Sequence, residues 1–549
     1  MHPVSAGEPR AVLAGGCIPA QRAAFLLALL IINGAARGAD FGEVGDFDIR
    51  LDTTLRETMG LRTGGEQSGV LADINADDGD RAFPHGLISA RTDIATELTA
   101  EHGDLGFDLS ADGWYDPVYQ GQSGGDSPAT FNPVSVHYDQ FPAATRRLLG
   151  GDAELDNAFV QDRVDIAGLP VSVRLGRQTL LWGESLFFAS NGIAGGQAPV
   201  DTIKSLNAPL ATARELYLPV TQLFARIELR PGLAIEAYDQ VEWRRDRLPG
   251  VASYFSTTDI LDAGGERLLL PNWGPLYRTA DSTPNGFGQF GLALRAQSDR
   301  VDLGLYALRF DAKSPQPVYK ESAGTYHLIF PRGIELYGAS FSTYAGSGTI
   351  SGEISFRRNM PLLAGGPSLG GSAAIGGGGI YAAAELPVST YYPPQPPAPL
   401  TSGFAVGETW QAQLSYEAQL PPSRWWQGAT IQSELATNDL VDVTGGHPYV
   451  LAGRTHFAAS WQGVFTPQYF QVLPGLDITL PLGLGYTPIG RSSIDSAMYA
   501  GAGDATVSVS ATYRQVWQGA VSFTHFIGGA TAQKLADRDF VSVSVARTF

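Results

Sequence analysis

Cysteine is almost absent from this sequence of 549 residues, in which Cys17 is the single copy. Cys17 lies in an N-terminal stretch that we expect to be removed, so the mature chain is predicted to carry neither a disulfide nor a thiol-ligated metal. No spacing of His, Asp and Glu predicts another metal site, and no cofactor is expected.

Charged residues are also scarce, at 17% of the chain where about 25% is usual. Acidic residues outnumber Lys and Arg by 55 to 37, which gives a formal net charge of −18. A strongly negative protein is repelled by phosphate backbones, so nucleic acid is excluded as a general partner.

The sequence further lacks the run of about 20 apolar residues that a membrane-spanning helix requires. The apolar stretch from Ala23 to Ile32 has ten residues, follows Arg22 and precedes small residues. This pattern predicts an export signal over residues 1–39, cleaved after Ala36 or Ala39.

The prominent feature is an alternation of apolar and polar residues with a period of two, clearest from Trp410 to Leu420 and again from Val541 to Phe549. Such alternation predicts strands with one apolar face. About 18 strands (16–18) are expected on this pattern, near 46–57, 88–100, 104–116, 157–167, 171–182, 216–229, 232–244, 287–297, 301–311, 333–344, 349–358, 408–420, 428–436, 455–466, 476–486, 505–515, 519–527 and 539–549.

The connections between these strands alternate between tight turns, such as 230–232, and long loops, such as 117–156 and 183–215. This order is typical of an up-and-down barrel with short periplasmic turns and long extracellular loops. We therefore predict an all-β protein in which residues 40–549 form one transmembrane antiparallel β-barrel. A soluble sandwich or propeller is the alternative. The sequence shows no subdivision that would support a sandwich, and no repeat of about 40 to 50 residues that would support a propeller.

The turns also predict which residues face each other across neighbouring strands. A turn at 230–232 places Arg226 opposite Glu236, and a turn at Gly346-Ser347 places Phe341 opposite Gly352. A turn at Ser298-Asp299 places Arg295 opposite Asp302. Each register brings apolar residues together on one face, as a barrel wall requires.

Polar residues on the inward face are candidates for the lining of a channel or a constriction. Arg174, Gln178, Trp182 and Glu184 share one parity beside loop 183–215, although Trp182 could instead be an interfacial aromatic and Arg174 a paired lumen charge. Loop 359–407 is rich in Gly and Pro and is a second candidate for a plug or constriction. The full set of lumen candidates is Arg174, Gln178, Trp182, Glu184, Arg226, Glu236, Arg295, Asp302, Glu353 and Arg357. Many of these charges could equally serve to hold the wall together by pairing across strands.

Several stretches together resemble one known family. They are "VRLGRQTLLWGESLFFASNGI" (173–193), "YDQVEWRRDRLPGVASYFSTTD" (238–259) and the closing "DRDFVSVSVARTF". They resemble bacterial outer-membrane proteins catalogued as domain of unknown function 1302, over nearly the whole mature chain. Where family members often read Asn-Pro-Val-Asp, this chain reads Ala-Pro-Val-Asp at 198–201. The resemblance implies the outer membrane of a Gram-negative cell, and work beside a periplasmic carrier and an inner-membrane pump. It brings no catalytic residues.

A barrel of this size is wide enough for a water-filled lumen, so an outer-membrane channel or transport protein is the predicted function. The family resemblance implies that its solute is a hydrophobic small molecule or lipid. Outer-membrane lipid and an unidentified small molecule are then the expected partners. A barrel enzyme of the lipase or deacylase type is one alternative, but His456 and Ser460, on one face of a strand, are separated by roughly 13 Å. A structural or adhesive barrel is another.

Overall fold

The computed structural model of this chain describes residues 39–44, 46–208, 210–261, 263–270, 274–320, 324–363, 404–447, 450 and 453–549. The predicted export signal, apart from Ala39, lies outside these ranges. So does most of loop 359–407, and with it the predicted plug.

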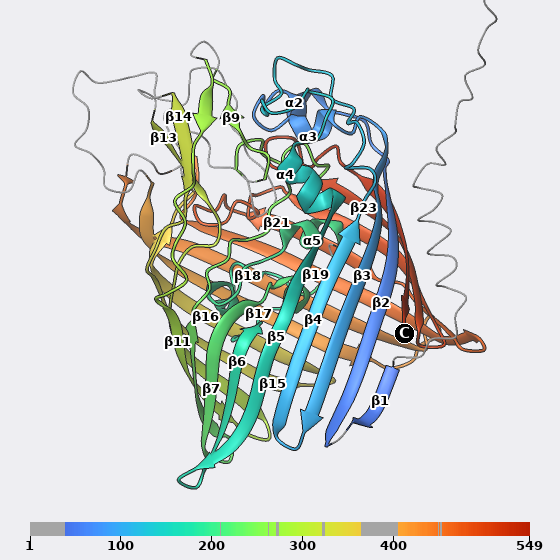
Figure 1. Cartoon of the computed structure of the whole chain (residues 1–549), viewed down its shortest axis with the longest axis vertical. Coiled ribbons are helices and arrows are strands. Elements are labelled where there is room, and N and C mark those ends of the chain that lie inside the picture. Colours follow the sequence, from blue (N-terminus) through green and yellow to red (C-terminus); the bar gives the residue numbers. More distant parts are fainter. Residues whose placement is uncertain are drawn as a thin grey trace, which may run out of the picture. The chain divides into compact units, whose positions relative to one another are not determined.

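Across the described residues, eighteen strands form one closed antiparallel barrel (Figure 1). Each strand pairs with its neighbour along the chain, and β24 closes the wall against β2. The wall consists of β2 (Phe47–Arg62), β3 (Gly86–His102), β4 (Leu105–Tyr115), β5 (Gly151–Ile166), β6 (Leu169–Gln178), β7 (Val220–Arg230), β8 (Leu233–Gln240), β11 (Gln289–Gln297), β12 (Val301–Phe310), β15 (Ile334–Ala345), β16 (Gly348–Pro361), β17 (Val406–Leu420), β18 (Gly428–Gly445), β19 (Phe457–Leu473), β20 (Leu476–Thr479) continued by β21 (Leu482–Ile489), β22 (Gly503–Tyr513), β23 (Trp517–Ile527) and β24 (Phe540–Thr548).

Two irregularities mark the wall. The fifteenth strand is divided into β20 and β21 at Leu480-Pro481, where proline supplies no backbone N–H for the ladder. A short strand, β1 (Ala39–Val44), pairs with the start of β2 outside the ring.

The alternation in the sequence places apolar side chains on the outer face of the wall and polar side chains on the inner face. Leu303 and Leu305 of β12 are 51% and 57% exposed on the outer face, and Val545 of β24 is 47% exposed. Polar inward residues such as Gln411 and Ser415 of β17 are buried. Because apolar side chains cover the outside of a sheet with no free edge, the surface suits a hydrocarbon solvent.

Most of the predicted registers are confirmed. Arg226 pairs with Glu236 on β7 and β8, and Phe341 pairs with Gly352 on β15 and β16. The register predicted for β11 and β12 is wrong by two residues, since Arg295 lies opposite Gly304 and Asp302 lies opposite Gln297. The turn there spans the four residues Ser298–Val301, with the Ser298 N–H bonded to the Val301 carbonyl. A shift of two residues preserves the faces, which is why the apolar pattern did not reveal it.

The strand predicted at 171–182 also ends early, at Gln178. Trp182 and Glu184 therefore belong to the connection between β6 and β7 and not to the wall. Trp182 is 3% exposed and packs against Tyr238 and Tyr306, with ring centroids 5.1 and 5.8 Å away. The alternative of an interfacial aromatic is wrong for Trp182.

The long connections gather at one rim of the barrel and the tight turns at the other (Figure 1). The long connections carry short helices and a small sheet: α2 (Ser68–Leu71), α3 (Asp78–Arg81), α4 (Ala143–Thr145), α5 (Thr202–Asn207), α6 (Ala213–Leu216), β9 (Arg267–Leu268), β10 (Leu276–Arg278), β13 (Gln316–Lys320) and β14 (Thr325–Ile329). Among the described residues, no helix combines the length and apolar character that a bilayer crossing requires.

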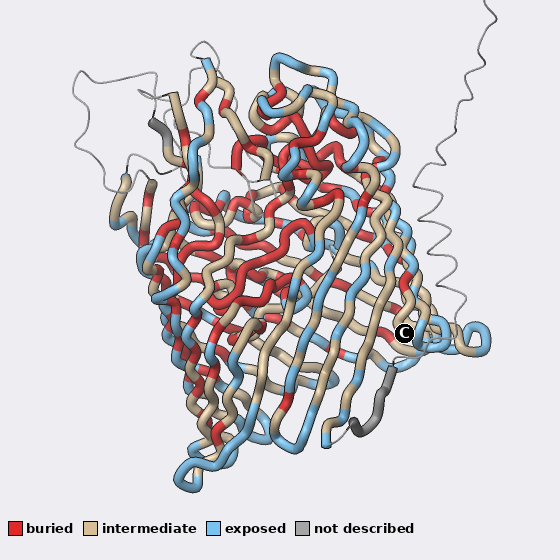
Figure 2. The backbone as a smooth tube through the Cα atoms, in the orientation of Figure 1, coloured by how far each residue is buried: buried red, intermediate tan, exposed pale blue. Residues whose placement is uncertain are grey.

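A hydrophobic core lies at the long-loop rim, where the β2–β3, β4–β5 and β8–β11 connections pack against one another; we call these three connections the cap. Phe83 stands at its centre, with the rings of Tyr119, Phe141 and Tyr254 each 5.7 Å away. Figure 2 shows buried segments concentrated in this cap and inside the loop-side half of the barrel; the strands at the front are mostly exposed or intermediate, and those at the left also carry buried residues. The barrel is therefore filled from one end by its own connections.

Candidate functional site

The connection between β6 and β7, residues 179–219, contacts side chains that point into the lumen from the opposite wall. We call it the inward segment. It has little regular structure beyond a 3-10 turn at Ile193–Gly196 and the two short helices α5 and α6. Its backbone polar groups need partners, because water is largely excluded around buried residues such as Ile193 and Ala194. The wall supplies those partners.

Glu353 of β16 is the first partner. Its carboxylate accepts hydrogen bonds from the backbone N–H groups of Glu184, at 2.5 Å, and Ile193, at 2.8 Å. Gly183 makes this approach possible, since a Cβ there would lie 2.1 Å from Glu353 Oε2, and its φ of +86° suits only glycine well. One carboxylate thus holds two turns of the inward segment.

Glu434 of β18 is the second partner. Its carboxylate accepts the consecutive N–H groups of Leu186, Phe187 and Phe188 at 3.0, 2.5 and 3.0 Å. The Gln413 amide, on β17 between the two glutamates, donates to Glu434 at 2.8 Å and to Ser185 Oγ at 3.0 Å. A carboxylate that receives several donors is well compensated for its burial.

Arg357 is the third partner and has the opposite charge. Its guanidinium donates to the carbonyls of Ser190, Asn191 and Gly192 at 3.3, 2.7 and 2.9 Å. The side chain is 2% exposed. We call Glu353, Arg357, Gln413 and Glu434 the lumen clamp, because together they fix residues 184–193 across the lumen.

The structure brings five of the ten sequence-predicted lumen residues to this site. Trp182 and Glu184 are in the inward segment, Glu353 and Arg357 are in the clamp, and Arg295 lies 3.9 Å from the Glu184 carboxylate. Arg295 also contacts the Tyr306 hydroxyl.

The other five candidates are part of the wall away from the clamp. Arg226 and Glu236 form an ion pair of 2.6 Å across β7 and β8. The Gln178 side-chain amide donates to the Gln222 backbone carbonyl on β7, and the Gln222 side-chain amide donates to the Gln178 backbone carbonyl, so the two residues reinforce the wall. The remaining two lie apart from the clamp: Arg174 is exposed over the Phe159 ring, and Asp302 faces Gln297 near the tight turns.

Sequence reasoning did not single out Glu434 and Gln413 as site residues. Both lie at inward positions of well-predicted strands, so their orientation was predictable. What they bind was not, because the partners are backbone groups of a segment that has no periodicity of its own.

A cavity of about 190 Å³ lies beside the clamp, between the inward segment and β19, β21 and β22. Aromatic and aliphatic side chains dominate its lining, among them Phe187, Phe188, Leu206, Leu216, Phe255 and Phe526. Asp504 of β22 also lines it. Within the described part of the chain, no hydrogen bond or ion pair engages the Asp504 carboxyl, which lies over the bare backbone of Gly485.

The residues considered for an enzymatic barrel have other partners. His456 Nδ1 bonds the Leu440 carbonyl at 2.7 Å, and Ser460 contacts the Thr487 hydroxyl. His525 Nδ1 lies 2.6 Å from Asp539, on an exposed part of the wall. A hydrolase of the triad type needs a nucleophile bonded to its base, and neither histidine is bonded to a serine of the described part of the chain.

The family model described as "Protein of unknown function (DUF1302)" matches residues 19–549. Among solved structures, the chain is similar to OccAB1 of Acinetobacter baumannii, with 12% identity over 94% of this chain and 99% of that one, at a TM-score of 0.41. It is also similar to OpdK of Pseudomonas aeruginosa, solved with vanillate, with 12% identity over 91% of this chain and 98% of that one, at a TM-score of 0.40. No curated protein sequence matches it.

Proposed function

The chain belongs to the DUF1302 family, and we propose that it is a channel of the Gram-negative outer membrane that passes small hydrophobic solutes. The lumen clamp carries this proposal. Burial of charged groups costs free energy, yet Glu353, Arg357 and Glu434 of the wall are buried and bind the backbone of one irregular segment across the lumen. A constriction of fixed shape is what a selective pore requires, whereas a purely structural barrel could fill its lumen with apolar residues.

The cavity beside the clamp supports a solute with an apolar body. Its walls offer aromatic rings and leucines, and 190 Å³ is room for a small ring compound. Asp504 adds one carboxyl with no partner among the described residues. A cationic group on the solute would supply that partner, so the preferred class is a hydrophobic amine.

The orientation follows from the two rims. The short-turn rim faces the periplasm and the capped rim faces the outside. A hydrophobic solute is poorly soluble in the periplasm, which is why a soluble carrier and an inner-membrane pump are proposed to work with the channel. Exchange with them would occur at the short-turn rim.

Reconstitution into planar lipid bilayers tests the proposed function. Purified protein should produce discrete current steps, and a hydrophobic amine such as phenethylamine should interrupt the current more than the neutral ethylbenzene. Folded protein that inserts without steps, and that hydrolyses lipid esters in detergent, would replace the channel with a barrel enzyme.

A further inference from the structure

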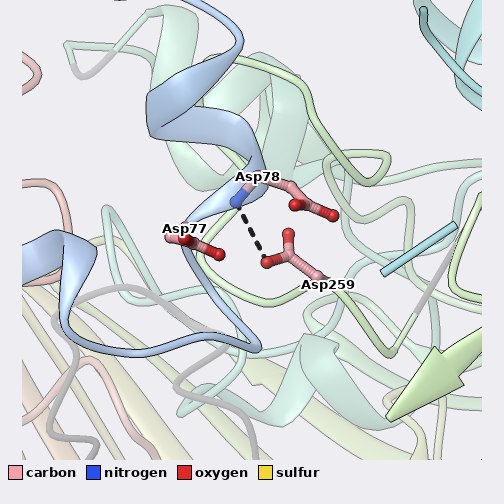
Figure 3. Close-up of side chains that lie close together, drawn as sticks. All are labelled: Asp77, Asp78 and Asp259. Atoms are coloured by element: carbon pink, nitrogen blue, oxygen red, sulfur yellow. Dashed lines mark hydrogen bonds between the residues drawn. The ribbon is translucent and has the colours of Figure 1, made fainter. Parts of the chain in front are cut away.

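Three aspartates meet in the cap at the loop-side rim (Figure 3). Asp77 and Asp78 lie at the start of α3, in the connection between β2 and β3, and Asp259 lies in the connection between β8 and β11. One carboxylate oxygen of each lies within 4.8 Å of the others. Asp77 and Asp259 are 0% exposed and Asp78 is 3% exposed, so the cluster is closed to solvent.

The hydrogen bonds of the cluster leave two oxygens unused. Asp259 Oδ2 accepts the Asp78 N–H at 3.1 Å, Asp78 Oδ2 accepts the Asn132 N–H at 2.9 Å, and Asp77 Oδ2 accepts Arg81 Nε at 2.6 Å. Asp77 Oδ1 and Asp259 Oδ1 are buried and have no hydrogen-bond partner among the residues that the structure describes. Figure 3 shows the Asp77 and Asp259 carboxylates turned toward each other. Buried acceptors without donors cost free energy, so this arrangement calls for a ligand.

Other carboxylates of the cap are matched by cations. Asp80 pairs with Arg62 at 2.8 Å, and Asp73 pairs with Lys534 at 3.1 Å. Within the described ranges, neither Asp78 nor Asp259 takes part in an ion pair. Within these ranges Arg81, which pairs with Asp77, is therefore the one cation in ion-pair contact with the three aspartates.

The charges of Arg267 and Arg538 act on Asp78 and Asp259 respectively, but neither arginine forms an ion pair with these carboxylates. Arg267 donates to the Phe131 carbonyl at 2.6 Å, and Arg538 donates to the Ser256 carbonyl at 2.6 Å.

We propose that Asp77, Asp78 and Asp259 bind one Ca²⁺ ion. Three carboxylates are hard oxygen ligands of the kind that Ca²⁺ and Mg²⁺ prefer. The closed position selects Ca²⁺, because Mg²⁺ usually keeps several of its waters while Ca²⁺ accepts an irregular shell of protein oxygens. The ion would bind the two oxygens that now have no partner.

The consequence is a bridge across the mouth of the barrel. The ligands come from the β2–β3 and β8–β11 connections, whose parent strands are well separated around the wall. A metal that binds the folded cap but not the unfolded chain stabilises the fold by mass action. The site thus fixes the cap independently of the lumen clamp.

Equilibrium dialysis of the full chain in detergent against radioactive Ca²⁺, with Asp259→Asn and Asp104→Asn as variants, tests the proposal. Asp104 is an exposed acid in the β3–β4 turn and serves as the matched control. The wild type and Asp104→Asn should retain one Ca²⁺ per chain and Asp259→Asn none. Wild-type chains that retain no ion, or Asp259→Asn chains that retain as much as wild type, would overturn the site.

Thermal unfolding gives a second measurement that needs no variant. Addition of EDTA should lower the unfolding midpoint of the wild type by a few degrees, and Ca²⁺ should restore it. Restoration by an equal concentration of Mg²⁺ would overturn the choice of Ca²⁺. Because bilayer conductance is recorded separately, loss of this site and loss of the channel function are distinguishable.

Discussion

Arg357 of β16 binds carbonyl groups, and Glu434 of β18 binds N–H groups, of the same short stretch of backbone. Arg357 binds the carbonyls of residues 190–192, and Glu434 binds the N–H groups of residues 186–188. Arg357 and Glu434 do not form an ion pair with each other. Each is compensated mainly by peptide dipoles, so the position of the inward segment depends on both.

Replacement of Arg357 by Gln should release residues 190–192. Hydrogen bonds to a charged group contribute about 1.5–3 kcal/mol, so the population of released segments should rise by a factor of about 10 to 100. Single-channel records should show more frequent high-conductance events. Arg358→Gln is the matched control, because Arg358 is exposed and pairs with Glu335 and Glu408. Equal gating in both variants would contradict the clamp.

Replacement of Glu434 by Ala should open the same constriction, since four donors lose their acceptor. Combined with Arg357→Gln, the effect on the free energy of release should be less than the sum of the two, because one segment is freed only once. Glu417→Ala provides the control: Glu417 is an inward, exposed acid whose partner is Gln432. Strict additivity in a double-mutant cycle of opening frequencies would argue against a shared segment.

Gly183→Ala should act like Arg357→Gln without any change of charge. The new Cβ would clash with Glu353 at 2.1 Å, and φ of +86° is strained for alanine. Gly65→Ala is a control at which a Cβ meets nothing within 4 Å. The expected result is increased conductance for Gly183→Ala alone. If the two variants behave alike, the contact between Gly183 and Glu353 does not position the segment.

Arg226→Glu should lower barrel stability more than it changes ion selectivity. The substitution sets an acid opposite Glu236 in place of the present ion pair of 2.6 Å. Cross-strand charge pairs contribute about 0.2–1 kcal/mol, and reversal adds a repulsion of similar size. A urea titration in detergent should show a lower midpoint, with reversal potentials near those of the wild type. An unchanged midpoint would count against the ion pair.

Asp504→Asn should remove the preference of the channel for amines over neutral analogues. The amide has nearly the shape of the carboxyl, so the apolar cavity remains while its charge is lost. Block by phenethylamine should then approach block by ethylbenzene. Asp477→Asn is the control, because Asp477 bonds the Gln471 backbone near the short-turn rim. Persistent amine block in Asp504→Asn would remove the carboxyl from the proposal.

The wall was predictable from the sequence because the alternation of apolar and polar residues along each strand is a local pattern. All eighteen predicted strands are present, and the inward or outward direction of Arg226 and Glu353 follows from a period of two. The errors arise where the alternation of inward and outward residues does not distinguish between two registers. A two-residue slip at Ser298–Val301 leaves every face unchanged, so only the turn geometry could reveal it.

The site was predictable only in part. The strand carrying Gln178 was expected to continue to Trp182, because Leu180 and Trp182 keep the alternation. Burial of Trp182 against two tyrosines of the lumen competes with that pattern and prevails. Glu434 could be placed inside the barrel, but its binding of three successive N–H groups depends on residues almost 250 positions away. Such contacts leave no periodic signal.

The seam between β2 and β24 has a consequence for biogenesis. Residues 54–62 pair with residues 540–548, so the ladder that closes the barrel joins positions separated by nearly the whole polypeptide. Until this ladder forms, both edge strands present unpaired peptide groups that can template aggregation. An unassembled chain therefore exposes two strand edges, at residues 54–62 and 540–548, and pairing of these two edges with each other removes both at once.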